Sequence, residues 1–194
     1  MSSLEWASIS TPVGPVSVGY GDAGVAQARF GPPPGGRSPE GNPAGAAPAA
    51  TAATTRAVVA SPATAAARQL AEYFCGQRRE FDLPVDWSAF GPAQRQVLRL
   101  LYDDVRYGQT VTYGNLAVRA GLEAADDVIP ARMVGQIMGS NPIPIIVPCH
   151  RVVASDGLGG YSGGAGPEVK RWLLILEGSL PPTLDWTPAQ PPRN

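Results

Sequence analysis

Residues 141–153 read Asn-Pro-Ile-Pro-Ile-Ile-Val-Pro-Cys-His-Arg-Val-Val, and the organisation of the whole chain is best understood outward from this stretch. It places His150, the only histidine of the chain, directly after Cys149, one of only two cysteines. A free cysteine is most often a small apolar core residue, so the pair by itself is equally consistent with a structural role. A cysteine that enters a turn or helix after a proline, however, gains thiolate character from the helix dipole. Cys149 is therefore a candidate nucleophile.

A base is needed to raise the thiolate share of such a thiol at neutral pH. Neighbouring residues on a helix do not face each other, so His150 would have to reach the sulfur through a bridging water. Glu177, at the end of a predicted helix over 169–177, is a candidate to hold the other imidazole nitrogen. The alternative for Glu177 is a solvated residue at a helix end. The second cysteine, Cys75, lies in a predicted helix next to Phe74 and is expected to be buried and inert.

Composition narrows the possible classes of protein. The chain has 194 residues, 44% of them hydrophobic, with 23 Gly and 21 Pro, so part of it is expected not to pack. The formal net charge of -1 excludes nucleic-acid binding driven by bulk charge, although a local basic contact stays possible. Two cysteines and one histidine cannot build a disulfide framework or a four-ligand zinc cluster, and no metal or cofactor is expected. No apolar run approaches the length of a membrane span, and a cytoplasmic protein without membrane contact is expected.

The N-terminal part reads as a small α/β unit over residues 1–87. Residues 4–30 alternate as strands do, and Gly21-Asp22 between two apolar runs predicts a β-hairpin. Residues 31–60 are rich in Ala, Pro and Gly and carry few large apolar side chains, so this stretch is predicted to be a disordered insertion. A helix is predicted over 62–76, where a serine cap precedes a proline and a glycine follows.

The C-terminal part, residues 88–180, has the periodicity of helices. Helices are predicted over 92–102, 113–120 and 130–139, and each is followed closely by a glycine or includes one at its end. Two short helices joined by a turn that contains glycine are typical of a helix-turn-helix, although such pairs occur in many helical domains. Residues 181–194 are predicted to be a flexible tail.

The stretch at 141–153, followed by Gly-Tyr-Ser-Gly-Gly at 160–164 and Trp-Leu-Leu at 172–174, resembles the O6-alkylguanine-DNA alkyltransferases (methylated-DNA–protein-cysteine methyltransferases). The resemblance covers roughly residues 81–178. It implies an α/β fold, in which a small N-terminal α/β domain precedes a mainly helical domain with a winged-helix-like helix-turn-helix. It further implies a monomeric DNA repair protein whose partner is double-stranded DNA. Such a protein flips O6-alkylguanine out of the duplex and transfers the alkyl group irreversibly to its own cysteine; O4-alkylthymine stays open as a further substrate.

The resemblance also implies roles for individual residues. Cys149 is the alkyl acceptor, His150 the base acting through water, Glu177 the residue that orients His150, and Asn141 the brace of the turn. Tyr113 helps to rotate the nucleotide and can donate a proton to the departing base. Arg132 is the arginine that fills the gap in the duplex, and Thr112, Ala131 and Gly135 are further DNA contacts. The walls of the pocket are formed by Met138, Pro144, Val152, Tyr161 and Ser162.

Some positions depart from the family pattern. Ala93 precedes Gln94 where a phenylalanine is usual, Met133 stands where a small alanine is common, and the linker over 122–129 is longer than usual. Two other functions are therefore kept as alternatives. One is a non-catalytic protein of the same fold that binds alkylated DNA, against which the presence of a cysteine at position 149 argues. The other is a cysteine hydrolase, for which adjacent Cys and His lack the direct contact that such triads need.

Overall fold

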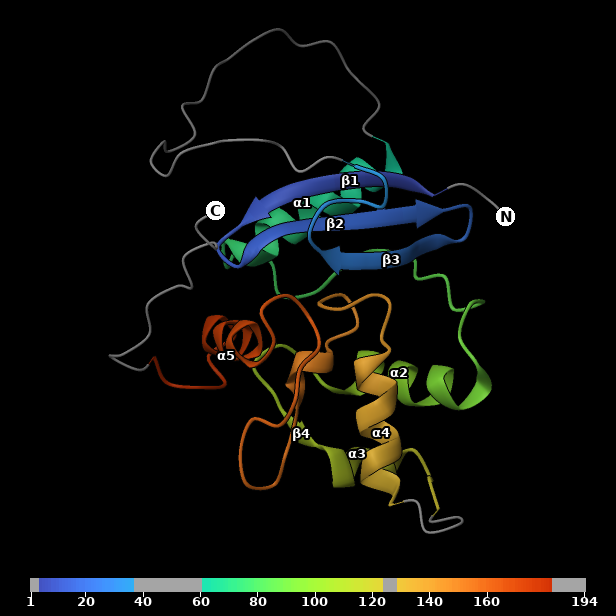
Figure 1. Cartoon of the computed structure of the whole chain (residues 1–194), viewed down its shortest axis with the longest axis vertical. Coiled ribbons are helices and arrows are strands. Elements are labelled where there is room, and N and C mark those ends of the chain that lie inside the picture. Colours follow the sequence, from blue (N-terminus) through green and yellow to red (C-terminus); the bar gives the residue numbers. More distant parts are fainter. Residues whose placement is uncertain (1–3, 37–60, 124–128, 183–194) are drawn as a thin grey trace, which may run out of the picture.

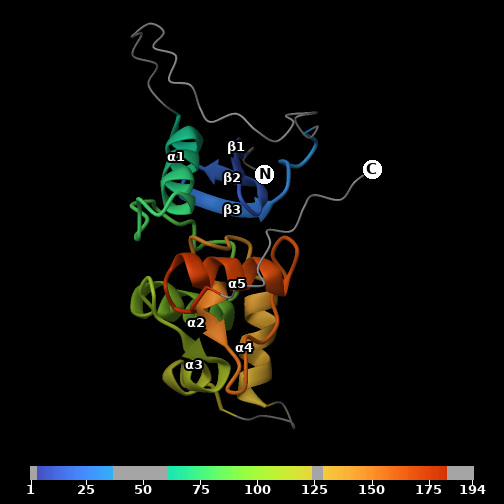
Figure 2. The same ribbon diagram turned by 90° about the vertical axis from the view of Figure 1, so that its left-hand side faces the viewer.

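The structure, a computed structural model, describes residues 4–36, 61–123 and 129–182 (Figure 1). It consists of an upper half, in which one helix packs on a small sheet, and a lower half built mainly of helices (Figures 1 and 2). The expected α/β class is therefore confirmed. The predicted insertion at 31–60 falls mostly on residues 37–60, which lie outside the described residues, as does nearly all of the predicted tail.

The upper sheet contains strands β1 (Glu5–Thr11), β2 (Gly14–Gly21) and β3 (Gly24–Phe30), antiparallel and in that order. The hairpin predicted at Gly21-Asp22 joins β2 to β3, and β1 adds a strand that the alternating pattern did not separate. The middle of β2, from Val16 to Gly19, is buried on both sides. Helix α1 (Pro62–Phe74) covers one face of the sheet, and the lower half of the molecule lies below the edge formed by β3 (Figures 1 and 2).

Helix α1 begins where the sequence predicts. Ser61 caps it by accepting a hydrogen bond from the Thr64 amide, and a proline occupies its first turn. Its buried residues recur at helical spacing and include Ala63, Ala66, Ala67, Leu70 and Tyr73. The helix ends at Cys75, which is exposed rather than buried, so that expectation was wrong. The reason is that Cys75 is the C-cap residue and turns away from the apolar stripe before Gly76, at φ +72°, reverses the chain.

The lower half contains four helices among the described residues. They are α2 (Pro92–Asp104), α3 (Tyr113–Arg119), α4 (Pro130–Gly139) and α5 (Pro167–Leu176). Helices α3 and α4 lie side by side at the end farthest from the sheet and form the predicted helix-turn-helix (Figures 1 and 2). Strand β4 (Val111–Thr112) pairs in parallel with β5 (Val152–Val153) and fixes α3 to the end of the 141–153 stretch.

Two backbone contacts join the halves. Val25 of β3 bridges to Val85, and the Ala28 amide donates to the Pro142 carbonyl at 2.8 Å. The second contact places the Asn-Pro turn beneath the sheet, while α5 runs beside it at the top of the lower half (Figures 1 and 2). No helix in the described ranges is both long and apolar enough to cross a bilayer.

Candidate active site

Cys149 opens a short 3-10 helix, η1 (Cys149–Arg151), at the end of a tightly held turn. Asn141 spans this turn: its Nδ2 donates to the Val147 carbonyl at 3.0 Å, and its Oδ1 accepts from the Ile143 amide at 3.1 Å. Ile145 has φ +75°, a left-handed conformation that is unfavourable for a β-branched residue. The sharp turn is thus maintained by the side chain of Asn141 and by burial of the apolar run, and it holds the thiol in one place.

The Cys149 thiol is buried, with only 5% of the residue exposed. Burial raises the pKa of this thiol, because a thiolate loses solvation in an apolar setting. The neighbouring Asn141 and Tyr161 side chains and the charge of Lys170 lower the pKa in part. The gain in acidity expected from the turn is therefore outweighed by desolvation. Ionisation of the thiol thus depends on a base that can take the proton.

His150 is fully buried and lies against Glu177, the residue that ends α5. The distance from His150 Nε2 to Glu177 Oε1 is 2.9 Å. Because a carboxylate can only accept, Nε2 carries the imidazole proton and Nδ1 presents a lone pair. Nδ1 is buried and has no hydrogen-bond partner among the described residues. Burial lowers the pKa of His150 more than the Glu177 carboxylate raises it, so the imidazole is neutral and able to accept a proton at Nδ1.

Glu177 is held by several donors in the interior. Arg151 donates from Nε to Oε2 and from Nη2 to Oε1, both at 2.9 Å, and Tyr73 donates to Oε1 at 2.6 Å. Burial alone would raise the pKa of Glu177, but the hydrogen bond from His150 and the hydrogen bonds and charge of Arg151 outweigh it and hold the pKa well below its usual range. The carboxylate is thus ionised and fixed in orientation behind the imidazole.

Lys170 of α5 is a second buried charge next to the site. Its Nζ donates to the Val152 carbonyl at 2.7 Å and to the Gly160 carbonyl at 3.1 Å, and it lies 5.6 Å from the ring centroid of Tyr113. Burial lowers the pKa of Lys170 to about 8, against a smaller opposite effect of Cys149. Lys170 therefore ties β5 to the loop at 160–162 beside the thiol, and its positive charge favours the thiolate.

The thiol faces a cavity of about 370 Å³ between α4 and the loop at 160–162. This volume falls within the usual range for small-molecule sites. The residues that line the cavity include six of the predicted site residues besides Cys149 and come from both sides of it: Tyr113, Ala131, Gly135, Met138, Gly139, Gly160, Tyr161 and Ser162. The Tyr113 hydroxyl donates to the Gly160 carbonyl at 3.2 Å and so holds one wall. The buried thiol therefore lies at the end of a cavity that polar and apolar residues line together.

Two predicted wall residues lie elsewhere. Pro144 lines a neighbouring hollow of about 420 Å³ between the 141–144 turn and β3, which also reaches Cys149. Val152 is fully buried in β5 and is absent from the lining of both hollows. Its carbonyl accepts a hydrogen bond from Lys170 Nζ at 2.7 Å.

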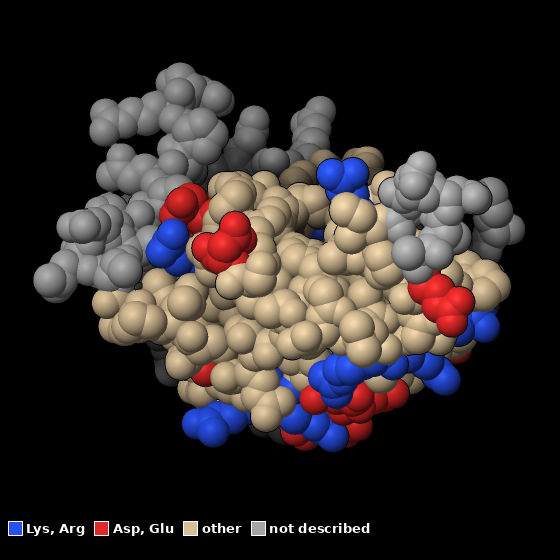
Figure 3. Space-filling view, turned by 90° about the horizontal axis from the view of Figure 1, so that it is seen from below, with Lys and Arg blue, Asp and Glu red and all other residues tan. Residues whose placement is uncertain are grey.

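The predicted DNA contacts lie on the lower face of the molecule, on and beside the helix-turn-helix. Arg132 is exposed on α4, and Ala131 and Gly135, of which one has only a methyl side chain and the other none, line the cavity. The Thr112 hydroxyl accepts from the Asn115 amide and caps α3. Seen from below, the middle of this face carries few charged side chains, which gather toward its margins (Figure 3).

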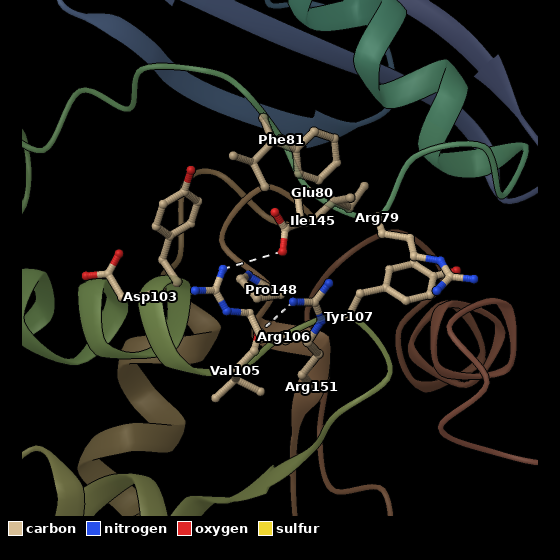
Figure 4. Close-up of a pocket in the computed structure, with 12 residues that line it drawn as sticks. Arg79, Glu80, Phe81, Asp103, Val105, Arg106, Tyr107, Ile145, Pro148 and Arg151 are labelled. Atoms are coloured by element: carbon tan, nitrogen blue, oxygen red, sulfur yellow. Dashed lines mark hydrogen bonds and ion pairs between the residues drawn. The ribbon is translucent and has the colours of Figure 1, made fainter.

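Three residues near the site were missed from the sequence: Tyr73, Arg151 and Lys170. Arg151 looks like an exposed charge after the Cys-His pair, yet its side chain is 8% exposed and its Nη1 donates to the Val105 carbonyl at 2.7 Å. Figure 4 shows Arg151 with Tyr107 beside it at the edge of a separate cavity of about 200 Å³. Lys170 lies one helical turn before Leu173 and Leu174, and this spacing is the signal that could have indicated its burial. Tyr73 carries no such signal, because its partner is about a hundred residues away.

The chain was compared with known proteins. Residues 92–179 match the family described as "6-O-methylguanine DNA methyltransferase, DNA binding domain". A methylated-DNA–protein-cysteine methyltransferase of Methanopyrus kandleri is 45% identical over 115 residues, which are 59% of this chain and 79% of the relative. The Mus musculus protein of the same name is 52% identical over 84 residues, 43% of this chain but only 37% of the relative's length.

The fold gives a parallel result. The structure described as Mycobacterium tuberculosis OGT in complex with DNA superposes with a TM-score of 0.65 at 34% identity, covering 90% of this chain and 93% of that one. Fold and site together define a protein with a small α/β half, a helix-turn-helix and a buried cysteine at the end of a cavity. This chain belongs to the 6-O-methylguanine DNA methyltransferase family.

Proposed function

We propose that this protein repairs DNA by direct reversal, taking the alkyl group of O6-alkylguanine onto Cys149 in a single turnover. The observation that carries the proposal is the position of the Cys149 thiol at the end of a cavity of about 370 Å³, beside α4 of the helix-turn-helix. A base stacked in a duplex cannot present its O6 substituent to a buried sulfur, so the nucleotide has to leave the stack and enter this cavity.

The chemistry is a substitution at carbon. The Cys149 thiolate attacks the alkyl carbon, the S–C bond forms, and the C–O6 bond breaks with its electron pair on the purine. Tyr113, whose hydroxyl lies at the cavity wall 3.2 Å from the Gly160 carbonyl, donates a proton to the departing base. The product is a thioether, which water does not hydrolyse as it would a thioester. The protein is therefore consumed in the reaction.

The proton of the thiol leaves toward His150. Its Nδ1 lone pair is the acceptor, reached through one bridging water, and the Glu177 carboxylate stabilises the imidazolium that forms. The adjacent positions of Cys149 and His150 in the chain fit this indirect route better than the direct contact required of a hydrolase. Asn141 keeps the turn in shape while the proton moves.

DNA binds at the lower face, in this proposal, with α4 against the duplex. The small residues Ala131 and Gly135 allow close approach of the helix, and Arg132 enters the space that the rotated nucleotide leaves. Because few charged side chains lie in the middle of this face (Figure 3), binding is weak, largely independent of sequence and only shallowly dependent on salt. Backbone amides at helix N-termini supply many of the phosphate contacts.

Intact-protein mass spectrometry tests this function directly. The wild type is incubated with an O6-methylguanine oligonucleotide or with O6-benzylguanine, alongside Cys149→Ser and, as the matched control, Cys75→Ser. We expect one alkyl adduct on the wild type and on Cys75→Ser, and none on Cys149→Ser. Binding of the oligonucleotide without any adduct on folded wild type would instead indicate a damage-binding protein. Release of product with turnover and an unmodified thiol would indicate a hydrolase.

A further inference from the structure

The Glu177 carboxylate receives one hydrogen bond from outside the lower half of the molecule. Tyr73 lies in α1, in the upper half, and its side chain reaches Glu177, the residue that follows α5. The residue is fully buried, and its hydroxyl donates to Glu177 Oε1 at 2.6 Å. It also lies 3.4 Å from His150 Nε2. A single hydroxyl of the N-terminal half therefore touches both members of the pair that handles the thiol proton.

Glu177 Oε1 is shared by three donors. They are the Tyr73 hydroxyl at 2.6 Å, His150 Nε2 at 2.9 Å and Arg151 Nη2 at 2.9 Å. A carboxylate oxygen has two in-plane lone pairs, so three donors compete for its charge. The shortest of these contacts is the one from Tyr73, and a hydrogen bond to an ionised group is about twice as strong as a neutral one. Tyr73 thus takes up part of the negative charge that would otherwise act on the imidazole.

We propose that Tyr73 is a positioning residue that fixes the Glu177 carboxylate against His150 and, by sharing its charge, keeps the imidazole neutral and able to accept the thiol proton. The inference rests on the function proposed above. It assigns to the N-terminal half a part in the reaction: α1 brings the donor, and the packing of α1 on the sheet sets its reach. The sheet and α1 then also help to position the Glu177 carboxylate.

Other charged and titratable groups face this pair. Arg151 of η1 and Lys170 of α5 are positive and lower the pKa of His150, and Tyr107 lies near Glu177 from the loop after α2. Cys149 precedes His150 on η1. None of these would change in a Tyr73→Phe variant, which removes one oxygen and leaves the ring in its place against Phe74, Phe81 and Tyr107.

Tyr107→Phe is the matched control. The two rings pack edge to face with centroids 6.1 Å apart, and the Tyr107 hydroxyl donates to the Leu176 carbonyl at 2.9 Å, one residue before Glu177. The control therefore removes the same group from the same cluster, and from a bond to the same helix end, without touching the carboxylate. In Figure 4, Tyr107 lies beside Arg151 at the cavity edge.

The test uses the single histidine of the chain. In the untagged full-length protein, an NMR titration of the imidazole carbon-bound protons reports His150 alone, whether or not alkyl transfer occurs. We expect the pKa of His150 to rise by about one unit in Tyr73→Phe, the change expected when one hydrogen bond from a neutral donor to a charged carboxylate is lost. We expect Tyr107→Phe to titrate as the wild type does. Equal titration of the two variants would overturn the proposal.

The rate of alkyl transfer to O6-benzylguanine gives the functional readout. Between pH 5.5 and 9, the acid limb of the profile should move upward by the same unit in Tyr73→Phe, giving about tenfold slower transfer on that limb and near wild-type rates above it. A uniform loss at every pH would indicate a structural role and contradict the inference. If the wild type transfers nothing, the function proposed above fails, and the NMR titration still decides whether Tyr73 sets the protonation of His150.

Discussion

Substitution of Glu177 by Gln should destabilise the protein far more than loss of an exposed ion pair would. The buried carboxylate accepts two hydrogen bonds from Arg151, and its own side chain is fully inaccessible to solvent. Glutamine keeps the shape but leaves the Arg151 guanidinium, 8% exposed, without its counter-charge. Breaking a buried pair in this way costs about 3–5 kcal/mol, because the remaining charge stays desolvated.

Glu72→Gln is the internal comparison. Glu72 pairs with Arg78 at 2.7 Å, a shorter distance than the 2.9 Å of the Glu177–Arg151 pair, but its side chain is 29% exposed. A pair screened by solvent contributes about 0–1 kcal/mol, so this variant should unfold nearly as the wild type does. Distance alone would rank the two pairs the other way, which makes burial the quantity under test.

The assay is urea unfolding followed by tryptophan fluorescence, with the free energy extrapolated to water. The pKa of Glu177 is lowered in the folded protein, so its stabilisation is complete above the unfolded value near 4.3 and decreases as the pH falls below it. The difference between wild type and Glu177→Gln should therefore be constant from pH 8 to 5 and become smaller below about pH 4. Equal losses of stability in Glu72→Gln and Glu177→Gln, or a gap that widens in acid, would refute this reasoning.

Three further outcomes are expected. Gly159→Ala should slow alkyl transfer and lower the unfolding free energy by about 1–3 kcal/mol, because Gly159 has φ +68° and a Cβ there would come within 2.9 Å of the Tyr113 ring. The rate of alkyl transfer and urea unfolding curves test this, and an unchanged transfer rate would contradict it. Asn141→Ala should cost about 1–3 kcal/mol by leaving two backbone groups of the turn unpaired, measured by the same unfolding curves, and an unchanged midpoint would count against the bracing role. A charged disulfide reagent should modify the exposed Cys75 rapidly and the buried Cys149 slowly. The variant Cys75→Ser should therefore lose the fast phase of the reaction. A fast phase that survives in this variant would show that Cys149 is open to solvent.

Local sequence signals predicted much of the fold. The serine cap and proline at the start of α1, and Gly21-Asp22 between two apolar runs, act over a few residues and were therefore readable in order along the chain. The predicted burial of Cys75 was wrong. The apolar Phe74 before it suggested a buried position, but the helix end turns Cys75 outward. Whether a residue at a helix terminus faces the core depends on the direction in which the chain leaves, which no local pattern specifies.

The chemistry of the site divides in the same way. Cys149, His150 and the turn before them are contiguous, so the sequence by itself identified the candidate nucleophile and base. The residues that tune them come from α1, η1 and α5, and only the tertiary structure brings Tyr73 and Arg151 to the Glu177 carboxylate and Lys170 to the Val152 carbonyl. Contacts between residues separated by tens of positions depend on how the two halves pack. A pKa is set by burial and by charges within a few ångströms, and these exist only once the chain has folded.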